Sequence, residues 1–368
     1  MKIIIRQLVE RDLFELSRFF RNAYGEKSAF ANQDFLSFYF SNSSQNEGKF
    51  NEMGFAAFFG ETIVSYYGIL HSNLVLNQGV LPIKWMVNAF TLSEYRGKGL
   101  NTAIIENLKK RYDTLGVISF PKESLGFYES LGFNTFQRST LSRYIYNLNE
   151  DTFEVVKAIN QDVGSAKILL PVKVSPSAQK IDTITSLRDF TGRSFNFHHF
   201  PEILTTYRTK NHFTSRYLNN PYITYLITYS NEYDSDASII VVRKEKLYPT
   251  QYFVYRIVDL YGNCDSLGPH IDSLIAKAYE DGALYLDFSC FGVLYEDLFK
   301  AKGFSMLKAD HIEILPQVTY PIENRKNLEF VALFSKTINV NDLSERNVYF
   351  TRGDSDRDRI NKLEQINI

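Results

Sequence analysis

The stretch "TLSEYRGKGLNTAIIENL", residues 91–108, places two glycines between basic residues just before an amphipathic segment. Glycine has no Cβ, so Gly97 and Gly99 let a ligand approach the main chain closely and permit positive φ angles. At the start of a helix the N–H groups are unpaired, and the helix dipole favours an anion. Arg96 and Lys98 add positive charge beside them. The stretch therefore predicts a phosphate-binding loop that leads directly into a helix.

The spacing of the glycines differs from two common phosphate-binding motifs. The sequence has no G-x-x-x-x-G-K-[ST] here, and the third glycine of G-x-G-x-x-G would fall on Thr102. A tight strand-to-helix turn without a ligand is the alternative interpretation.

The segments around this loop predict alternating strands and helices. Strands are expected at 2–8, 54–60, 62–76, 83–92, 115–120 and 141–148, and helices at 10–24, 101–112 and 124–133. A polar loop is expected at 41–51. In the second half, strands are expected at 222–230, 237–246, 251–262 and 283–290, and helices at 267–281 and 293–304.

Length and composition indicate a globular protein of two domains. The chain has 368 residues, of which 44% are hydrophobic and 23% charged. A net charge of -1 argues against a general nucleic-acid-binding surface. Two cysteines argue against a disulfide framework, and no apolar run approaches the roughly 18 residues of a membrane span. A charge follows the first apolar residues too early for a signal peptide, so a cytoplasmic protein is expected.

The glycine loop resembles the central motif of the GNAT acyltransferase superfamily, R/Q-x-x-G-x-G/A, in the residues from Arg96 to Gly99. Asn101 stands where that family usually has Gly or Ala, and Asn keeps the main-chain donor and is suited to capping the helix. In the family this motif binds the pyrophosphate of acetyl-CoA or another acyl-CoA. The resemblance implies these cofactor-binding residues: Phe90, Thr91, Arg96, Gly97, Lys98, Gly99, Leu100, Asn101 and Thr102.

Two further segments resemble the same superfamily in the same order. "IRQLVERDLFEL" is similar to its opening strand and helix, and "SLGFYESLGF" to its later aromatic motif. The resemblance implies that strands 87–92 and 116–120 diverge into a V-shaped cleft for the pantetheine arm. It also implies that Tyr128 protonates the departing sulfur, although a tyrosine packed under the cleft is equally consistent. Lys122 replaces an Asn that contacts the cofactor in relatives.

A weak internal repeat predicts two copies of one α/β unit. "FYESLGF" (127–133) and "LFKAKGF" (298–304) share their spacing, and each follows a helix and a strand. The expected fold class is α/β (α+β), with two GNAT-like domains, each a mixed, mostly antiparallel twisted sheet flanked by helices, the second degenerate. The expected divisions are an acyl-CoA-binding domain at 1–148, a linker at 149–175, a degenerate acceptor-side domain at 176–340 and a charged tail at 341–368.

No metal site is expected. His198 and His199 are adjacent and face opposite ways in a strand, and the aspartates at 354, 356 and 358 lack the downstream Gly and Glu of a calcium loop. No general base stands out, since Glu94 is better explained as a surface residue and His71 as a structural one. The segment "SRYLNNPYITY", which contains Arg216, resembles part of tandem-GNAT proteins.

The segment "YFTRGDSDRDR" resembles tails of two-domain GNAT proteins of bacterial surface-glycan assembly, such as lipopolysaccharide, O-antigen or capsule. Those proteins acylate amino sugars, often carried on a nucleotide. The resemblance implies that the acidic cluster holds a cationic amino group.

The leading hypothesis is an acyl-CoA-dependent N-acyltransferase that moves an acetyl or short (hydroxy)acyl group to a small-molecule amine, such as a nucleotide-linked amino sugar. One alternative is an aminoacyl-tRNA-dependent peptide ligase of cell-wall synthesis, which the near-neutral charge and intact glycine loop argue against. The other is a non-catalytic acyl-CoA-binding module. No nucleic-acid or membrane partner is expected, and the oligomeric state is left open.

Overall fold

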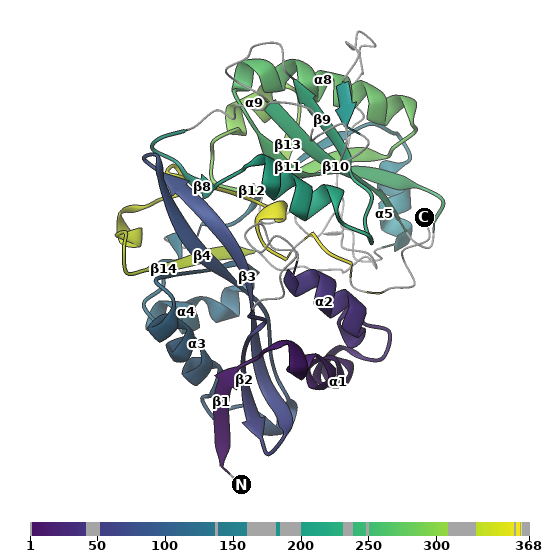
Figure 1. Ribbon diagram of the computed structural model, residues 1–368. Coiled ribbons are helices and arrows are strands. Elements are labelled where there is room, and N and C mark those ends of the chain that lie inside the picture. The colour runs from purple at the N-terminus through teal and green to yellow at the C-terminus, as the bar shows by residue number, and fades with distance from the viewer. Residues whose placement is uncertain are drawn as a thin grey trace.

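The computed structural model describes residues 2–41, 52–136, 139–159, 182–184, 200–230, 238–247, 250–307, 329–356, 358–360 and 362. Within these residues, one sheet of fifteen strands runs through both halves of the molecule. Its order is β14-β5-β4-β3-β8-β15-β12-β11-β10-β9-β7, with β2 and β1 branching from β3, and β6 and β13 from β12. Figure 1 shows an N-terminal lobe below and a C-terminal lobe above.

The N-terminal lobe is built from five strands in chain order and four helices. The strands are β1 (Ile3–Gln7), β2 (Gly54–Phe59), β3 (Thr62–Leu76), β4 (Gly79–Thr91) and β5 (Thr114–Phe120). The helices are α1 (Leu13–Tyr24), α2 (Gln33–Ser41), α3 (Leu100–Arg111) and α4 (Leu125–Ser130). Strands β1 to β4 pair antiparallel in sequence order, whereas β4 and β5 are parallel.

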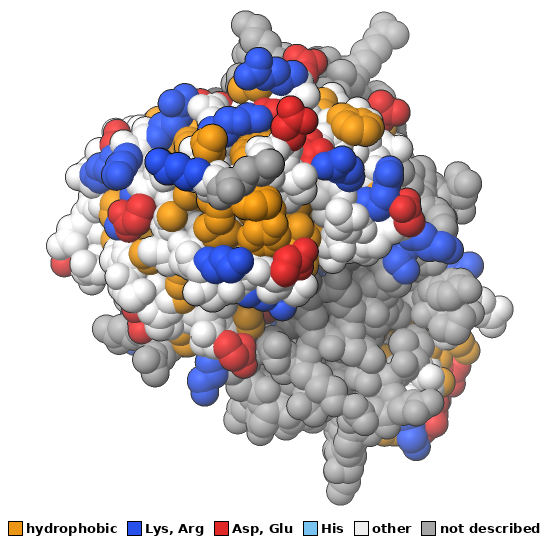
Figure 2. All heavy atoms as spheres, turned by 90° about the horizontal axis from the view of Figure 1, so that it is seen from below, with side chains coloured by type: hydrophobic (Ala, Val, Ile, Leu, Met, Phe, Trp, Pro, Cys, Tyr) orange, Lys and Arg blue, Asp and Glu red, His pale blue; other side chains and the backbone are white. Residues whose placement is uncertain are grey.

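Alternation along β3 gives this lobe two apolar faces. Leu70 and Leu74 pack with α1 and α2 on one face, while Tyr67 and Ile69 pack with α3 and α4 on the other. Figure 1 shows the same two layers on either side of β3 and β4. Seen from below, the end of the molecule formed by this lobe carries apolar side chains with Lys and Arg around them (Figure 2).

The C-terminal lobe repeats part of this arrangement. Its elements are β6 (Ser142–Asn147), α5 (Thr152–Ile159), β7 (Asp182–Ile184), β8 (Leu204–Thr206), α7 (Lys210–Phe213), the π-helical turn η6 (Thr214–Leu218), β9 (Leu226–Ser230), β10 (Ser238–Lys246), β11 (Phe253–Tyr261), α8 (Cys264–Glu280), β12 (Tyr285–Phe291), α9 (Glu296–Ala301) and β13 (Ser305–Leu307). Short 3₁₀ turns are η1 (Glu10–Asp12), η2 (Ala29–Ala31), η3 (Ser93–Tyr95), η4 (Lys122–Ser124), η8 (Val340–Asp342) and η9 (Arg352–Asp354).

The order β4, α3, β5, α4 of the N-terminal lobe recurs in the C-terminal lobe as β11, α8, β12, α9. In both units the two strands are parallel neighbours. In both, the short second helix ends at a glycine of positive φ, Gly132 (78°) or Gly303 (85°). The predicted repeat of one α/β unit therefore has a counterpart in the topology, and helices flank the part of the sheet that lies in each lobe.

The two lobes exchange strands, which the sequence does not predict. Strand β6, expected to close the N-terminal sheet, instead pairs with β12 and β13 in the C-terminal lobe. Its place beside β5 is taken by β14 (Phe330–Ser335), which follows the C-terminal lobe in the chain. The division at residue 148 remains a prediction about domains, but the sheet itself does not divide there.

The described part of the segment from residue 341, expected to be a charged tail, is packed against the rest of the molecule. Strand β15 (Val348–Thr351) lies in the sheet between β8 and β12, and residues 352–356 are buried after it. The tail is packed because its charged side chains meet buried partners of opposite charge, as described below. His198, His199 and most of the predicted linker lie outside the described residues, although α5 occupies the linker's start.

Among the helices that the structure describes, none has both the length and the apolar character needed to span a bilayer.

Candidate functional site

Strands β4 and β5 pair over two residue pairs only and then diverge. The ladder joins Lys84 to Leu115 and Trp85 to Gly116. Past this point β5 pairs with β14 on its other side, and β4 continues to Thr91 paired with β3 alone in the described structure. The divergence that the resemblance implied is therefore present.

A bulge marks each arm of the opening. Asn88 in β4 has φ 53° and Ser119 in β5 has φ 67°, a conformation that non-glycine residues adopt rarely. At Asn88 the register against β3 shifts, and at Ser119 the register against β14 shifts. Both bulges lie three residues beyond the last β4–β5 pair, within the diverging parts of the two strands.

The vertex of the opening is closely packed. A Cβ on Gly116 would lie 2.3 Å from Cζ3 of Trp85 and 2.9 Å from a methyl carbon of Leu333. The indole of Trp85 thus lies against the β5 main chain where the two strands part. Only glycine fits at residue 116, so this contact sets where the gap begins.

The glycine loop has the conformation that the sequence predicts. Gly97 and Gly99 have φ angles of 74° and 71°, and no atom lies within 4 Å of a Cβ built on either residue. Gly99 is the N-cap of α3. Among the hydrogen bonds of the described residues, none uses the main-chain N–H groups of residues 97–102. The loop therefore presents unpaired donors at a helix N-terminus, a suitable site for a phosphate group.

The basic side chains of the loop lie over aromatic rings. Nε of Arg96 donates to the carbonyl of Thr91 at 3.1 Å, and its guanidinium lies 5.6 Å from the centre of the Phe90 ring. Nζ of Lys98 lies 4.7 Å from the centre of the Tyr95 ring. These contacts hold both cations beside the loop without a carboxylate partner in the described structure, so their charge is available to an anion.

Asn101 does not cap α3. Its Oδ1 accepts hydrogen bonds from Thr91 Oγ1 at 2.8 Å and from Ser65 Oγ at 3.0 Å. Ser65 and Thr91 are themselves 2.7 Å apart. Because the N-cap is Gly99, Asn101 stands in the first turn, where its side chain instead fixes the helix start to the ends of β3 and β4.

Tyr128 lies under the opening, against the β5 arm. It is 4% exposed, its ring packs on Phe120, and its hydroxyl is 3.2 Å from the Tyr67 hydroxyl of β3. Burial, and then the neighbouring Tyr67, raise the pKa of Tyr128 well above its usual value. The hydroxyl therefore keeps its proton at neutral pH and is a donor. Lys122 is exposed at the start of η4.

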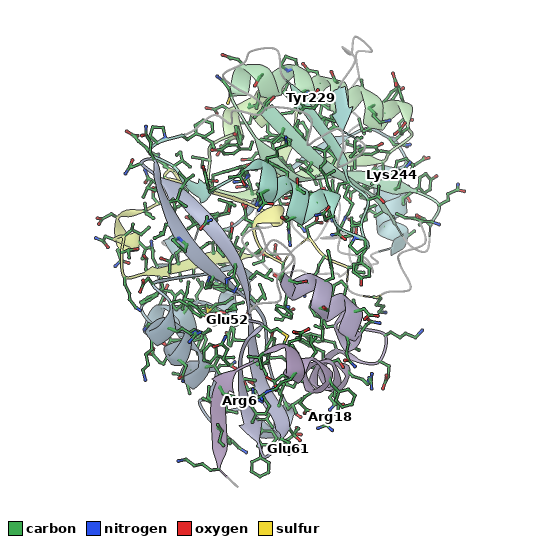
Figure 3. All side chains as sticks on the ribbon, in the orientation of Figure 1. Arg6, Arg18, Glu52, Glu61, Tyr229 and Lys244 are labelled. Carbon is green, nitrogen blue, oxygen red and sulfur yellow. The ribbon has the colours of Figure 1, made fainter. Side chains whose placement is uncertain are left out.

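The two side chains considered as general bases are poorly suited to that role. Glu94 is fully exposed and bonds to Ser93. His71 lies 2.6 Å from Lys84 Nζ, and burial, followed by the Lys84 charge, lowers the pKa of His71 to about 4. Glu52, labelled in Figure 3, binds Arg111 nearby, at the end of α3 remote from the glycine loop. A group as weakly basic as His71 removes a proton from an ammonium inefficiently.

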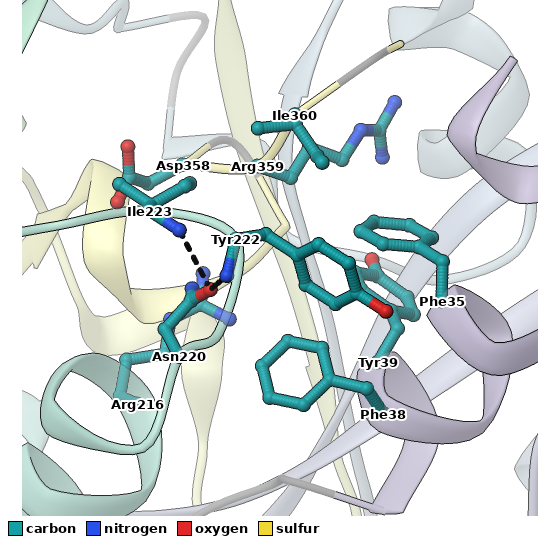
Figure 4. A pocket seen from close by; sticks show the side chains of 10 residues that line it. All are labelled: Phe35, Phe38, Tyr39, Arg216, Asn220, Tyr222, Ile223, Asp358, Arg359 and Ile360. Atoms are coloured by element: carbon teal, nitrogen blue, oxygen red, sulfur yellow. Dashed lines mark hydrogen bonds between the residues drawn. The ribbon is translucent and has the colours of Figure 1, made fainter. Parts of the chain in front are cut away.

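Two adjacent pockets lie on the face of β3 and β4 that is opposite α3 and α4. They are formed between α2 and the C-terminal lobe. Tyr39 and Arg216 line both pockets. Figure 4 shows the first, where aromatic side chains of α2 face Tyr222 and Arg216. Asn88 connects this face to the β4 bulge, because its Nδ2 donates to the Tyr39 hydroxyl at 3.3 Å.

The aspartates near the C-terminus do not form an open cation-binding cluster. Asp354 is paired with the buried Arg208 at 2.9 Å, and Asp358 is paired with Arg243 at 2.7 Å. Asp356 is paired with Arg359. The expectation that this cluster holds a cationic amino group is therefore wrong, since each of the three carboxylates is already paired with an arginine. The described residues also contain no group of three His, Cys, Asp or Glu placed to hold a metal.

Comparison with known proteins finds similar solved structures but no similar curated sequences. No protein-family model matches the chain, and no curated protein matches its sequence. Among solved structures, a probable N-acyltransferase of Enterococcus faecalis V583 covers 90% of this chain and 72% of its own at 12% identity and a TM-score of 0.56. A GCN5-related N-acetyltransferase of Anabaena variabilis ATCC 29413 covers 90% and 72% at 8% identity and a TM-score of 0.54.

Saccharomyces cerevisiae N-myristoyltransferase with bound myristoyl-CoA covers 90% of this chain and 79% of its own, at 9% identity and a TM-score of 0.51. Identities this low show a common fold alone. The fold is that of the GCN5-related N-acetyltransferases, as the sequence motifs predicted.

Sequence analysis missed helix α2 and the pockets that it lines. A signal was present, because Asn32 precedes the segment and its side chain accepts the N–H of Phe35 at 2.9 Å, as an N-cap does. The pockets themselves join segments that are far apart in the chain, and no local pattern predicts that.

Proposed function

We propose that this protein is an N-acyltransferase that uses an acyl-CoA as donor and a small-molecule amine as acceptor. The observation that carries the proposal is the row of unpaired main-chain N–H groups at residues 97–102, at the mouth of the β4–β5 gap. A diphosphate on these donors would direct the pantetheine arm into the gap, along main-chain groups of β4 near Phe90 and Thr91. The shared fold supports this use, since one of the similar structures contains myristoyl-CoA.

The proposed reaction joins the amine nitrogen to the thioester carbonyl carbon and breaks the carbon–sulfur bond. The amine loses its proton to a base or to water, and the coenzyme A thiolate gains one. Main-chain N–H groups beside the β4 bulge would stabilise the oxyanion. Tyr128 is the proposed donor to the sulfur because its hydroxyl carries a proton at neutral pH, although burial makes it a weaker acid than an exposed tyrosine.

For the acceptor, we propose an amino sugar carried on a nucleotide. The resemblance of the segment around residues 349–359 to proteins of surface-glycan assembly supports this choice. The acyl group would be acetyl or a short hydroxyacyl group. The assay measures release of coenzyme A from a set of acyl-CoAs, each offered with amino-sugar nucleotides and with amines that carry no nucleotide. It tests both the proposed acceptor and the proposed acyl group.

Calorimetry with coenzyme A tests the donor site. Gly99→Glu places a carboxylate on the loop and a side chain at φ 71°, so we expect coenzyme A binding to be lost. Gly282→Glu is the matched control, because Gly282 has φ 78° and equally open space but ends α8 in the C-terminal lobe. Binding that survives Gly99→Glu, or that is lost equally in both variants, would contradict the assignment.

A further inference from the structure

Arg216 differs from the other charged side chains around the two pockets. Its guanidinium donates to the main-chain carbonyl of Ser355, and no described carboxylate forms a hydrogen bond or ion pair with it. Asp358 lines the same pocket, but its two oxygens are taken by Arg243 and by the Tyr225 hydroxyl. Arg216 is therefore a half-buried cation that the nearby Asp358 charge stabilises without contacting it, so its guanidinium can still bind an anion that enters the pocket.

The position of Arg216 fits a ligand-binding role. It belongs to the π-helical turn Thr214–Leu218, a local irregularity that is common at functional sites. It lines both pockets, so it stands where they meet. In Figure 4 it lies at the base of the first pocket, below Asn220 and across from the aromatic side chains of α2.

The same pockets reach the β4 strand. Arg359 donates to Oδ1 of Asn88 at 2.7 Å, and the Tyr39 hydroxyl accepts from Nδ2 of the same side chain. Trp85, which packs at the vertex of the gap, lines the second pocket. A molecule held at Arg216 would thus lie on the face opposite α3, beside the strand along which the thioester is proposed to lie.

We propose that Arg216 binds an anionic group of the amine acceptor, a carboxylate or a phosphate, and so orients the amine toward β4. This rests on the proposed acyltransferase function, whose acceptor it defines as an amine that also carries a negative charge. A guanidinium is suited to this, because its planar fork of donors matches both anions. The aromatic wall of Phe35, Phe38 and Tyr222 would pack against the rest of the acceptor.

Paired probes test the proposal on the full chain saturated with coenzyme A, so that the glycine loop is filled. Glucosamine 1-phosphate is compared with glucosamine, and glycine with glycinamide, by ligand-observed NMR titration. We expect the member that carries the phosphate or carboxylate group to bind, in at least one pair, roughly ten- to a hundredfold more tightly than the member that lacks it. The pair that shows the difference identifies the anion as phosphate or carboxylate.

Arg216→Gln should abolish that preference, and Arg216→Lys should keep part of it, because the charge remains without the fork. Arg346→Gln removes the same charge from an exposed site and should leave the preference unchanged. Unchanged coenzyme A affinity in each variant shows that the fold is intact. Equal binding within both pairs in the wild type, or a preference that survives Arg216→Gln, would overturn the proposal. Failure of coenzyme A to bind the wild type would instead count against the acyltransferase function itself.

Discussion

Tyr128 allows the proposed chemistry to be tested at a single atom. Phenylalanine fills the same space beside Phe120 and removes the hydroxyl alone. We expect Tyr128→Phe to lower kcat by roughly 10²- to 10⁴-fold, the usual contribution of a positioned general acid, with coenzyme A affinity unchanged. Steady-state assays of coenzyme A release, with calorimetry on the same samples, measure both quantities.

The neighbouring tyrosine supplies the control. Tyr67→Phe removes the partner of the Tyr128 hydroxyl and leaves the donor in place, so a much smaller loss is expected. Because burial raises the pKa of Tyr128, its proton is lost only well above pH 10, and the wild-type rate should not decline through deprotonation of this group below that pH. Equal turnover in Tyr128→Phe and the wild type would exclude Tyr128 as the acid.

Among the structural elements, the junction of β4 and β5 decides whether a cleft exists. Gly116→Ala would place a methyl group 2.3 Å from the Trp85 ring, within a contact that also includes Leu333. We expect a loss of about 1–3 kcal/mol in the free energy of unfolding, as overpacking of a core typically costs. Urea unfolding followed by circular dichroism measures the change.

Gly126→Ala is the matched control for this junction. Gly126 lies in α4 with no atom within 4 Å of a built Cβ. The same substitution there should leave stability unchanged or raise it by up to about 1 kcal/mol, since alanine favours a helix. If Gly116→Ala were as stable as Gly126→Ala, the packed vertex would not be what separates the two strands.

Sequence patterns predicted most helices and strands, but they predicted fewer of the strand pairings and side-chain hydrogen bonds. The glycine loop and α3 were predictable because turn chemistry and helical periodicity are local, and both lie within residues 96–111. Strand β6 was predictable as a strand, but nothing in its alternation indicates pairing with β12, from which more than a hundred residues of chain separate it. The Asn101 side chain was likewise assigned to the nearest helix end, whereas Ser65 on β3 is its partner.

At the scale of the whole molecule, the packing of each lobe includes a strand from the other half of the chain. In the N-terminal lobe, β5 pairs with β4 over two residue pairs and with β14 along its length. Val331 and Leu333 of β14 are fully buried in the core that includes Ile118. A fragment of residues 1–148 would lose these contacts and expose the long edge of β5.

We therefore expect the 1–148 fragment to lack a cooperative thermal transition and to bind coenzyme A far more weakly than the full chain, although it contains the complete glycine loop. Circular dichroism melting and calorimetry on the fragment and the full chain test this. Mixing the fragment with residues 149–368 should restore part of the binding, because that piece supplies β14 to β5 and β12 to β6. A fragment that melts sharply and binds coenzyme A as the full chain does would show that the N-terminal lobe folds without β14, and that the strand exchange joins two independently stable units.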